Sequence, residues 1–287
     1  MSRNENQWIF SEAELANTPS IQDGLPPEEE AAQRAKGVNF ILQVGILLSL
    51  PQLTLSTACI FFQRFLMRAS LQKARDGIPK LHPYQSAGTA LFLATKVEES
   101  SRKMRDLVQS CCRVATKSPN AIVDEQSKDY WRWRDTLLDT EDVLLEVLCF
   151  DLSIDSAHRQ LFEMLKFYKL EHNKRLRNAA WAFVTDSINT QLCLLCSSRT
   201  IAGAALYAAC RFCDVTIPLD DRERPWYAVQ HIKVSELRRA IVYVTRSWAA
   251  AANKPDAPTQ EVEESIYKDL VPPSPGLNGR EEGELEE

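Results

Sequence analysis

Two stretches of small apolar residues, 86–95 and 201–210, constrain the fold of this chain more than any other feature. Each carries an Ala-Gly pair, followed three residues later by Leu and an aromatic residue. A helix that is apolar nearly all round is buried, and small side chains let neighbouring helices approach it closely. This internal repeat therefore predicts two helical bundles, each packed around one such helix. It indicates that a five-helix unit was duplicated. Chance similarity of two alanine-rich helices stays open as the alternative.

Glycine is scarce, with nine in 287 residues, whereas an average chain contains about 7%. Few tight turns can form, which argues against a β-sandwich, a barrel or a glycine-rich nucleotide-binding fold. No stretch offers the roughly 18 consecutive apolar residues of a membrane helix, and residues 1–6 lack the apolar segment of a signal peptide. We expect an all-α protein of the cytosol or nucleus that does not contact a membrane.

Local signals predict where the helices begin and end. Ser11 and Glu14 form a capping box, which predicts a short helix at 11–16. Proline and three acidic residues at 27–30 predict the start of a long helix that ends before Pro51. Further helices are expected at 54–69, 83–99, 103–116 and 131–150, and then from 156, at 173–190, 197–213 and 235–252.

These elements divide the chain into four parts. We expect an N-terminal segment at 1–27, a first bundle at 28–152, a second bundle at 153–252 and a tail at 253–287. The tail has a net charge of −7 against −5 for the whole chain, so the remainder is near +2. The tail has too few apolar residues to fold alone and is predicted to be disordered, as a spacer, a partner peptide or a solubilising end. A body near +2 is not basic enough for us to expect direct nucleic-acid binding.

The sequence contains little that points to catalysis. It has no phosphate-binding glycine loop, nucleophile elbow or zinc-protease pattern, and its four histidines are expected at the surface or as helix caps. Cys193 with Cys196 and Cys210 with Cys213 have the spacing of a zinc site. Their apolar neighbours favour core packing instead. We therefore expect no enzyme, no cofactor and no metal, and an interaction module is the better hypothesis.

An aromatic and basic cluster, Trp-Arg-Trp-Arg at 131–134, follows a long loop at 117–129. Such side chains can stack on nucleic-acid bases. Anchoring of the loop by its aromatic residues is the second interpretation, and we favour it.

Two segments carry a resemblance to a known family. Residues 91–99, Leu-Phe-Leu-Ala-Thr-Lys-Val-Glu-Glu, resemble the third helix of the cyclin box, and residues 140–152 resemble its fifth helix. The opening at 7–20 and the stretch at 52–65 are similar to transcriptional cyclins of the T and K type. The resemblance covers about residues 7–250 and is most specific in the first box. It implies two tandem five-helix cyclin boxes.

The resemblance also implies a function. A cyclin of this class is a nuclear, non-catalytic subunit that binds and activates a cyclin-dependent kinase. That kinase phosphorylates the C-terminal domain of RNA polymerase II and promotes transcription elongation. In the family a lysine and a glutamate grip the mobile helix of the kinase, and they fall on Lys96 and Glu141. Phe150 matches a further contact position. Neighbours expected on the same face are Glu98, Glu99, Leu145 and Phe10.

Alternatives remain open at this point. Lys96 and Glu141 could form an internal or solvated ion pair, and Phe150 could belong to the core. Residues 33–40 depart from the substrate-docking run of cell-cycle cyclins, so a docking patch is not expected there. A TFIIB-like factor uses the same paired fold on DNA, but it would need a more basic body and an N-terminal zinc ribbon. A kinase-independent scaffold is the remaining alternative.

Overall fold

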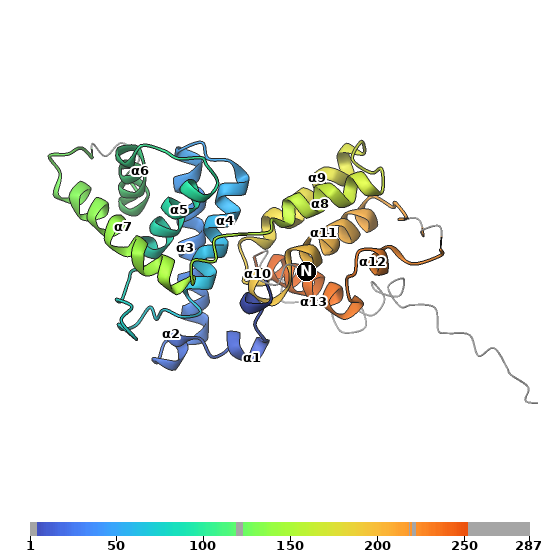
Figure 1. Ribbon diagram of the computed structural model, residues 1–287, viewed down its shortest axis with the longest axis horizontal. Helices are drawn as coiled ribbons and strands as arrows, with labels where there is room; N and C mark the ends of the chain where they lie inside the picture. Colours follow the sequence, from blue (N-terminus) through green and yellow to red (C-terminus); the bar gives the residue numbers. More distant parts are fainter. Residues whose placement is uncertain (1–4, 119–122, 218, 220–221, 252–287) are drawn as a thin grey trace, which may run out of the picture.

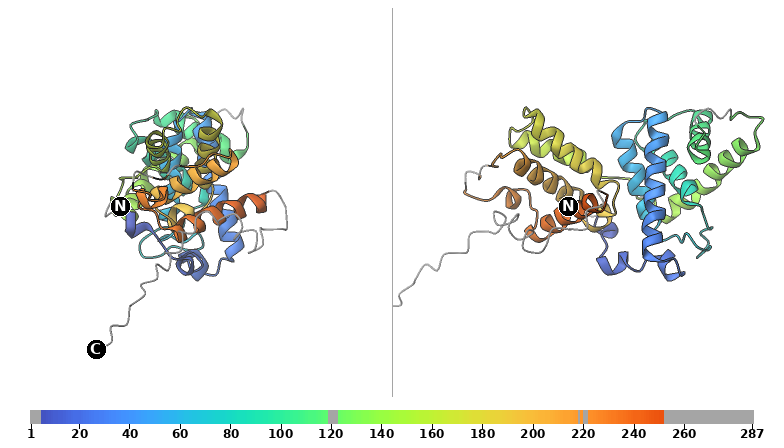
Figure 2. Two further views of the ribbon diagram at one scale, coloured as in Figure 1. Left: turned by 90° about the vertical axis from the view of Figure 1, so that its right-hand side faces the viewer. Right: turned by 180° about the vertical axis from the view of Figure 1, so that it is seen from behind.

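The computed structural model describes residues 5–118, 123–217, 219 and 222–251, which form helices and one isolated β-bridge between Arg75 and Ile78. The helices gather in two groups that lie side by side along the molecule (Figure 1, Figure 2). The predicted all-α fold is confirmed. Within the described residues no helix combines the length and the hydropathy that crossing a bilayer requires. The predicted tail and part of the 117–129 loop lie outside the described residues.

The first group contains five long helices with α5 at its centre. Their bounds are α3 (Pro27–Leu47), α4 (Gln52–Phe65), α5 (Pro83–Val97), α6 (Met104–Thr116) and α7 (Lys128–Val147). α5 packs against α3, α4 and α7, as a helix that is apolar nearly all round requires. The ring of His82 caps α5 by accepting the N–H of Tyr84 (3.2 Å). Burial and the charge of Lys36 lower the pKa of His82, and the neutral ring is the form that can accept this bond.

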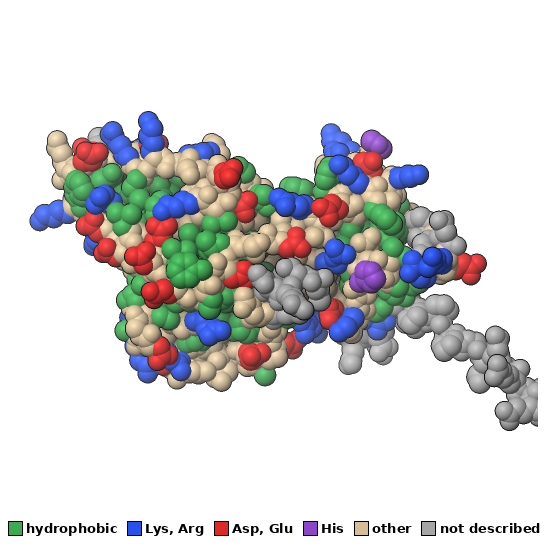
Figure 3. Space-filling model, viewed as in Figure 1, with side chains coloured by type: hydrophobic (Ala, Val, Ile, Leu, Met, Phe, Trp, Pro, Cys, Tyr) green, Lys and Arg blue, Asp and Glu red, His purple; other side chains and the backbone are tan. Residues whose placement is uncertain are grey.

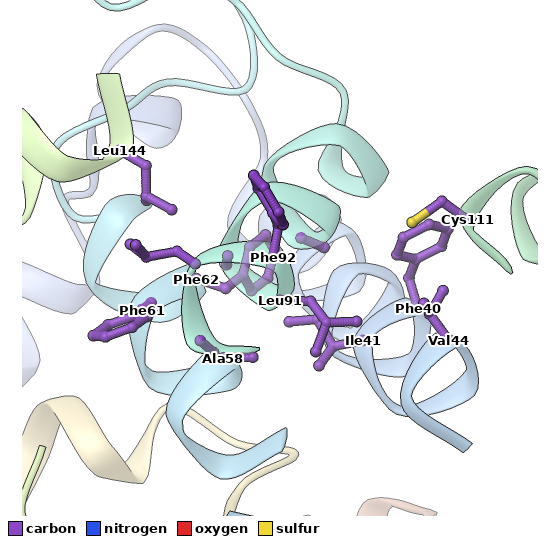
Figure 4. Packing of buried hydrophobic residues seen from close by; sticks show 14 of the residues in the cluster. Phe40, Ile41, Val44, Ala58, Phe61, Phe62, Leu91, Phe92, Cys111 and Leu144 are labelled. Atoms are coloured by element: carbon purple, nitrogen blue, oxygen red, sulfur yellow. The ribbon is translucent and has the colours of Figure 1, made fainter. Parts of the chain in front are cut away.

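Aromatic and aliphatic side chains from α3, α4 and α5 interlock in the core of this group (Figure 4). Phe61, Phe62 and Leu91 are fully buried there. A Cβ atom at Gly37 would come within 2.2 Å of the Phe62 ring. The close approach of α3 and α4 therefore depends on glycine at this position.

The second group is arranged around α11 as the first is around α5. Its helices are α8 (Ala157–Phe167), α9 (Lys174–Ser187), α10 (Leu192–Leu195), α11 (Ser198–Phe212), α12 (Trp226–Val229) and α13 (Val234–Ala251). α11 packs against α8, α9 and α13. The two Ala-Gly pairs have a shared packing reason. A Cβ atom at Gly88 would lie 3.3 Å from Trp133, and one at Gly203 would lie 2.4 Å from Ile232, so both glycines make room for a large neighbour.

The N-terminal segment bridges the two groups. Its elements are a 3₁₀ turn (Glu5–Trp8), α1 (Glu12–Leu15) and α2 (Pro19–Gln22). The predicted capping box is present, because Ser11 Oγ accepts the Glu14 N–H (3.3 Å) and Glu14 Oε2 accepts the Ser11 N–H (2.8 Å). The Phe10 N–H donates to the carbonyl of Leu194 in α10 (2.7 Å). This bond ties the segment to the second group.

Arg34 is a buried charge near the start of the 33–40 stretch, with 2% of its surface exposed. Its Nε donates to Glu30 Oε1 (2.5 Å) and its Nη1 to Gln63 Oε1 (2.8 Å). Its Nη2 donates to the carbonyl of Leu66 (3.2 Å). The stretch therefore contributes an internal clamp between α3 and the end of α4.

The last helix of the first group lies about one turn earlier than the predicted 131–150. Ser127 Oγ accepts the Tyr130 N–H (3.2 Å), and this cap starts α7 at Lys128. The helix ends at Val147 because Cys149 and Phe150 both adopt left-handed backbone, with φ of 53° and 54°.

Candidate functional site

Packing of α5 against α7 brings Lys96 and Glu141 together. The hydroxyl groups of Thr89 in α5 and Thr140 in α7 share a buried hydrogen bond (2.6 Å). Lys96 follows in the last turn of α5, and Glu141 comes directly after Thr140. The two charges therefore lie together at one edge of this helix pair.

Lys96 and Glu141 form an ion pair with each other, as in the alternative that the sequence left open, and their contact with a kinase stays a prediction. Lys96 Nζ lies 2.6 Å from Glu141 Oε1 and 2.8 Å from Oε2. Nζ also lies 4.0 Å from the ring centroid of Phe92. The Lys96 side chain is 46% exposed and that of Glu141 is 14% exposed. Pairs near the surface contribute only about 0–1 kcal/mol, so the fold does not depend on this one.

The pair keeps hydrogen-bonding capacity for a partner. An ammonium group has three N–H donors, and a carboxylate has about four lone-pair sites. Two donors of Lys96 are directed at Glu141, so one donor and several lone pairs remain. A charged donor beside a charged acceptor suits the free C=O and N–H groups at helix ends.

Leu145 and Phe150 extend the site from Glu141. Leu145 is half-buried and four residues after Glu141, so both lie on one face of α7. The carbonyl of Leu145 accepts the Phe150 N–H (3.0 Å). Phe150 is 67% exposed, so its side chain does not belong to the core.

The remaining predicted residues differ in position. Glu98 Oε1 accepts a hydrogen bond from the hydroxyl of Thr57 (2.7 Å), which lies in the N-terminal half of α4. Glu99 is exposed, and its backbone is left-handed with a φ of 51°. Phe10 is half-buried and lines a groove with Met67, which follows the C-terminal end of α4. Phe10 thus lies beside the opposite end of α4 from Glu98.

Trp8 and Asp151 were not predicted as site residues from the sequence, although they contact each other beside Phe150. Trp8 Nε1 donates to Asp151 Oδ2 (2.9 Å), and so does Gln7 Nε2 (2.6 Å). The available signals were a tryptophan in a polar N-terminus and an acidic residue directly after Phe150. Neither signal predicts that Trp8 and Asp151 contact each other.

The aromatic cluster at 131–134 is engaged within the chain. Trp133 is buried and stacks on Phe40, with ring centroids 5.7 Å apart. Trp131 Nε1 donates to the carbonyl of Glu125 in the preceding loop (2.8 Å). These contacts favour the loop-anchoring interpretation. On the face shown in Figure 3, basic and acidic side chains are interspersed over both groups of helices.

The two cysteine pairs lie in and around the second core. Cys196 and Cys210 are buried, while Cys193 and Cys213 are half-buried. Burial raises the pKa of Cys193 to about 11 and that of Cys210 to about 12. Both pKa shifts have the cause that core packing supplies, namely removal of the thiol from water. Across the described part of the chain, no three His, Cys, Asp or Glu side chains gather as a metal site would need.

Two helical groups in tandem, each packed around a small-residue helix, are the architecture of proteins with paired cyclin boxes. The sequence places this chain within that class. It belongs to the cyclin family, because residues 7–153 match the family described as Cyclin, N-terminal domain.

Relatives with known names agree with this assignment. The chain is 47% identical over 208 residues to Cyclin pch1 of Schizosaccharomyces pombe, covering 72% of this chain and 58% of that protein. It is 33% identical over 212 residues to human Cyclin-K, covering 73% of this chain and 34% of that protein. The chain thus spans less than two thirds of the length of either relative.

Solved structures share the fold. A chain of the yeast RNA Pol II CTD kinase CTDK-1 complex has a TM-score of 0.71 at 17% identity, covering 92% of this chain and 83% of that one. A chain of the yeast TFIIK (Kin28/Ccl1/Tfb3) complex has a TM-score of 0.60 at 17% identity, covering 85% and 98%. At these identities the likeness concerns the fold alone.

Proposed function

We propose that this chain is the regulatory subunit of a transcriptional cyclin-dependent kinase and carries no catalytic residue of its own. The kinase acts on the C-terminal domain of RNA polymerase II, and the heterodimer promotes transcription elongation in the nucleus. The observation that carries the proposal is the Lys96–Glu141 pair at the edge of α5 and α7, together with the exposed Phe150 in the turn that follows α7. The relationship to Cyclin pch1 and Cyclin-K supports the transcriptional class.

The proposed mechanism is a shift in the conformational population of the kinase. A kinase alone samples inactive positions of its mobile helix and activation loop. A subunit that binds only the inward position of that helix increases the active fraction. Lys96 donates to a carbonyl at one end of a partner segment, Glu141 accepts an N–H, and Phe150 supplies apolar contact. The cyclin contributes binding free energy and no reacting atom.

Affinity purification of the chain from its own cells, followed by mass spectrometry, tests this proposal. The eluate is then assayed for kinase activity on a peptide of the polymerase C-terminal repeats. A stoichiometric kinase with activity on that peptide supports the proposal. Recovery of promoter DNA or polymerase without a kinase favours a TFIIB-like factor. Recovery of other proteins without a kinase favours a scaffold.

The double variant K96A/E141A tests the site itself. Truncating a charge pair that is buried in an interface costs about 2 kcal/mol or more, so we expect the affinity for the kinase to fall at least about 30-fold. The melting temperature should change by less than about 2 °C, because the pair lies near the surface.

The control is D129A/R132A. This exposed pair, 3.4 Å apart, lies in the first turns of the same helix and has the same charges. We expect it to bind the kinase like the wild type. Equal affinities of the two double variants would contradict the assigned site.

A further inference from the structure

The turn after α7 has a backbone that side-chain-bearing residues rarely adopt. Cys149 and Phe150 are consecutive non-glycine residues in the left-handed region, with φ of 53° and 54°. This conformation is unfavourable for each of them and persists where the surroundings over-determine it. The contacts that hold this turn therefore decide where the Phe150 side chain points.

Backbone bonds hold the turn from the side of the helix. The Cys149 N–H donates to the carbonyl of Glu146 (2.9 Å), and the Phe150 N–H donates to that of Leu145 (3.0 Å). Both bonds end on α7 and close its last turn. The Asp151 N–H adds a third bond, to the carbonyl of Leu148 (2.9 Å), and none of the three provides an attachment to a segment outside the end of α7.

Asp151 supplies that attachment through its side chain. One oxygen, Oδ2, accepts from Trp8 Nε1 (2.9 Å) and from Gln7 Nε2 (2.6 Å). Hydrogen bonds to a charged acceptor are roughly twice as strong as neutral ones. The residue directly after Phe150 is therefore held by the N-terminal segment.

The donor end of this contact is itself fixed in the fold. Trp8 is 2% exposed and packs in the first core. The guanidinium of Arg64 in α4 lies 4.9 Å from the centroid of its ring. Two residues later, Phe10 bonds to Leu194 of the second group (2.7 Å). An indole held in this way is a rigid point from which to position Asp151.

We propose that Trp8 is a positioning residue. By donating its indole N–H to Asp151 it holds the turn in which Phe150 faces solvent, and so it sets the aromatic contact offered to the kinase. This inference rests on the proposed function for the identity of the partner. The state of the turn itself can be measured without any kinase. The N-terminal segment thus serves the kinase-binding face by supporting Phe150.

The variant W8F keeps a large ring beneath Arg64 and removes the N–H donor. We expect the amides of residues 149–152 to exchange with deuterium about tenfold faster. We also expect a loss of about five- to tenfold in affinity for the recombinant form of the kinase recovered in the purification above. The control is W248F, because Trp248 Nε1 makes a similar bond to Asp186 Oδ2 (3.0 Å) in the second group. W248F should leave both the amide exchange of residues 149–152 and the affinity for the kinase unchanged.

A double-mutant cycle shows whether Trp8 acts through Phe150. In an F150A background, W8F should cause no further loss of affinity. If W8F unfolds the chain, D151A takes its place, because it removes the acceptor of the same hydrogen bond.

Unchanged exchange at residues 149–152 in W8F would overturn the inference, and so would an equal loss of affinity in the F150A background. Faster exchange in W8F, with full kinase binding in both F150A and K96A/E141A, would overturn the proposed function. The positioning of the turn by Trp8 would then still stand.

Discussion

Arg34→Met tests the buried clamp between α3 and α4. Arg34 is 2% exposed, and Glu30, its ion-pair partner, is also 2% exposed. Burial lowers the pKa of Arg34 while the charge of Glu30 opposes that shift, and a guanidinium remains protonated at neutral pH. The hydroxyl of Thr18 donates to the same carboxylate oxygen (3.3 Å). Methionine fills similar space but donates no hydrogen bond.

The variant removes the arginine donor from the amide oxygen of Gln63, from the carbonyl of Leu66 and from the carboxylate of Glu30, which keeps only the hydroxyl of Thr18. Removing one partner of a buried ion pair costs about 3–5 kcal/mol. For a chain of this size, 1 kcal/mol corresponds to about 2–4 °C in melting temperature. We therefore expect R34M to melt about 6–20 °C below the wild type.

Two further variants serve as controls for R34M. E30M/R34M removes both charges and should recover most of the loss, because the cost comes from the unpaired carboxylate. R132M replaces an arginine whose side chain is 73% exposed and should melt within about 2 °C of the wild type. Thermal and urea unfolding followed by circular dichroism compare the four proteins. A fall of less than 2 °C for R34M, or a double variant as unstable as the single one, would refute the reasoning.

Two more predictions concern titratable side chains. Burial lowers the pKa of His158 to about 4 from about 6.5 in an unfolded chain, so the folded state holds a neutral ring beside the Thr185 hydroxyl (3.3 Å). The contribution of His158 to stability is complete above about pH 6.5 and is lost as the pH falls towards 4. The wild type should therefore lose its advantage in melting temperature over H158Q across that pH range. A difference that stays constant with pH would contradict this. Cys149 is exposed, whereas burial raises the pKa of thiols such as Cys111, so a thiol reagent should label Cys149 first in the native chain. A fast labelling phase that survives in C149S would be evidence against this order.

Local patterns predicted the long helices well. The capping box at Ser11 and the proline in the first turn of α3 each depend on a few neighbouring residues, and the structure contains both. The one-turn helices α2, α10 and α12 were missed because such short helices depend on contacts from elsewhere in the chain. For α10 one such contact is the bond from the Phe10 N–H to the carbonyl of Leu194.

The candidate site was predictable in part. The resemblance to cyclins singled out Lys96 and Glu141, and the structure adds that they pair with each other (2.6 Å), while contact of either with a kinase stays a prediction. Phe10 was expected on the same face and stays a prediction; the structure places it in a groove with Met67, beyond the C-terminal end of α4. The identity of a residue does not tell which way its segment crosses the bundles, since that path depends on packing between distant helices.

The sequence by itself determined the helical class, the two central small-residue helices and the charges that follow them. These depend on side chains a few residues apart, where periodicity and capping act directly. Only the tertiary structure decided that Arg34 is buried with Glu30 and that Trp8 reaches Asp151. A charged or aromatic side chain gives no local sign of whether it will meet water or a distant partner. Whether such a side chain is exposed or buried depends on how the helices pack against one another.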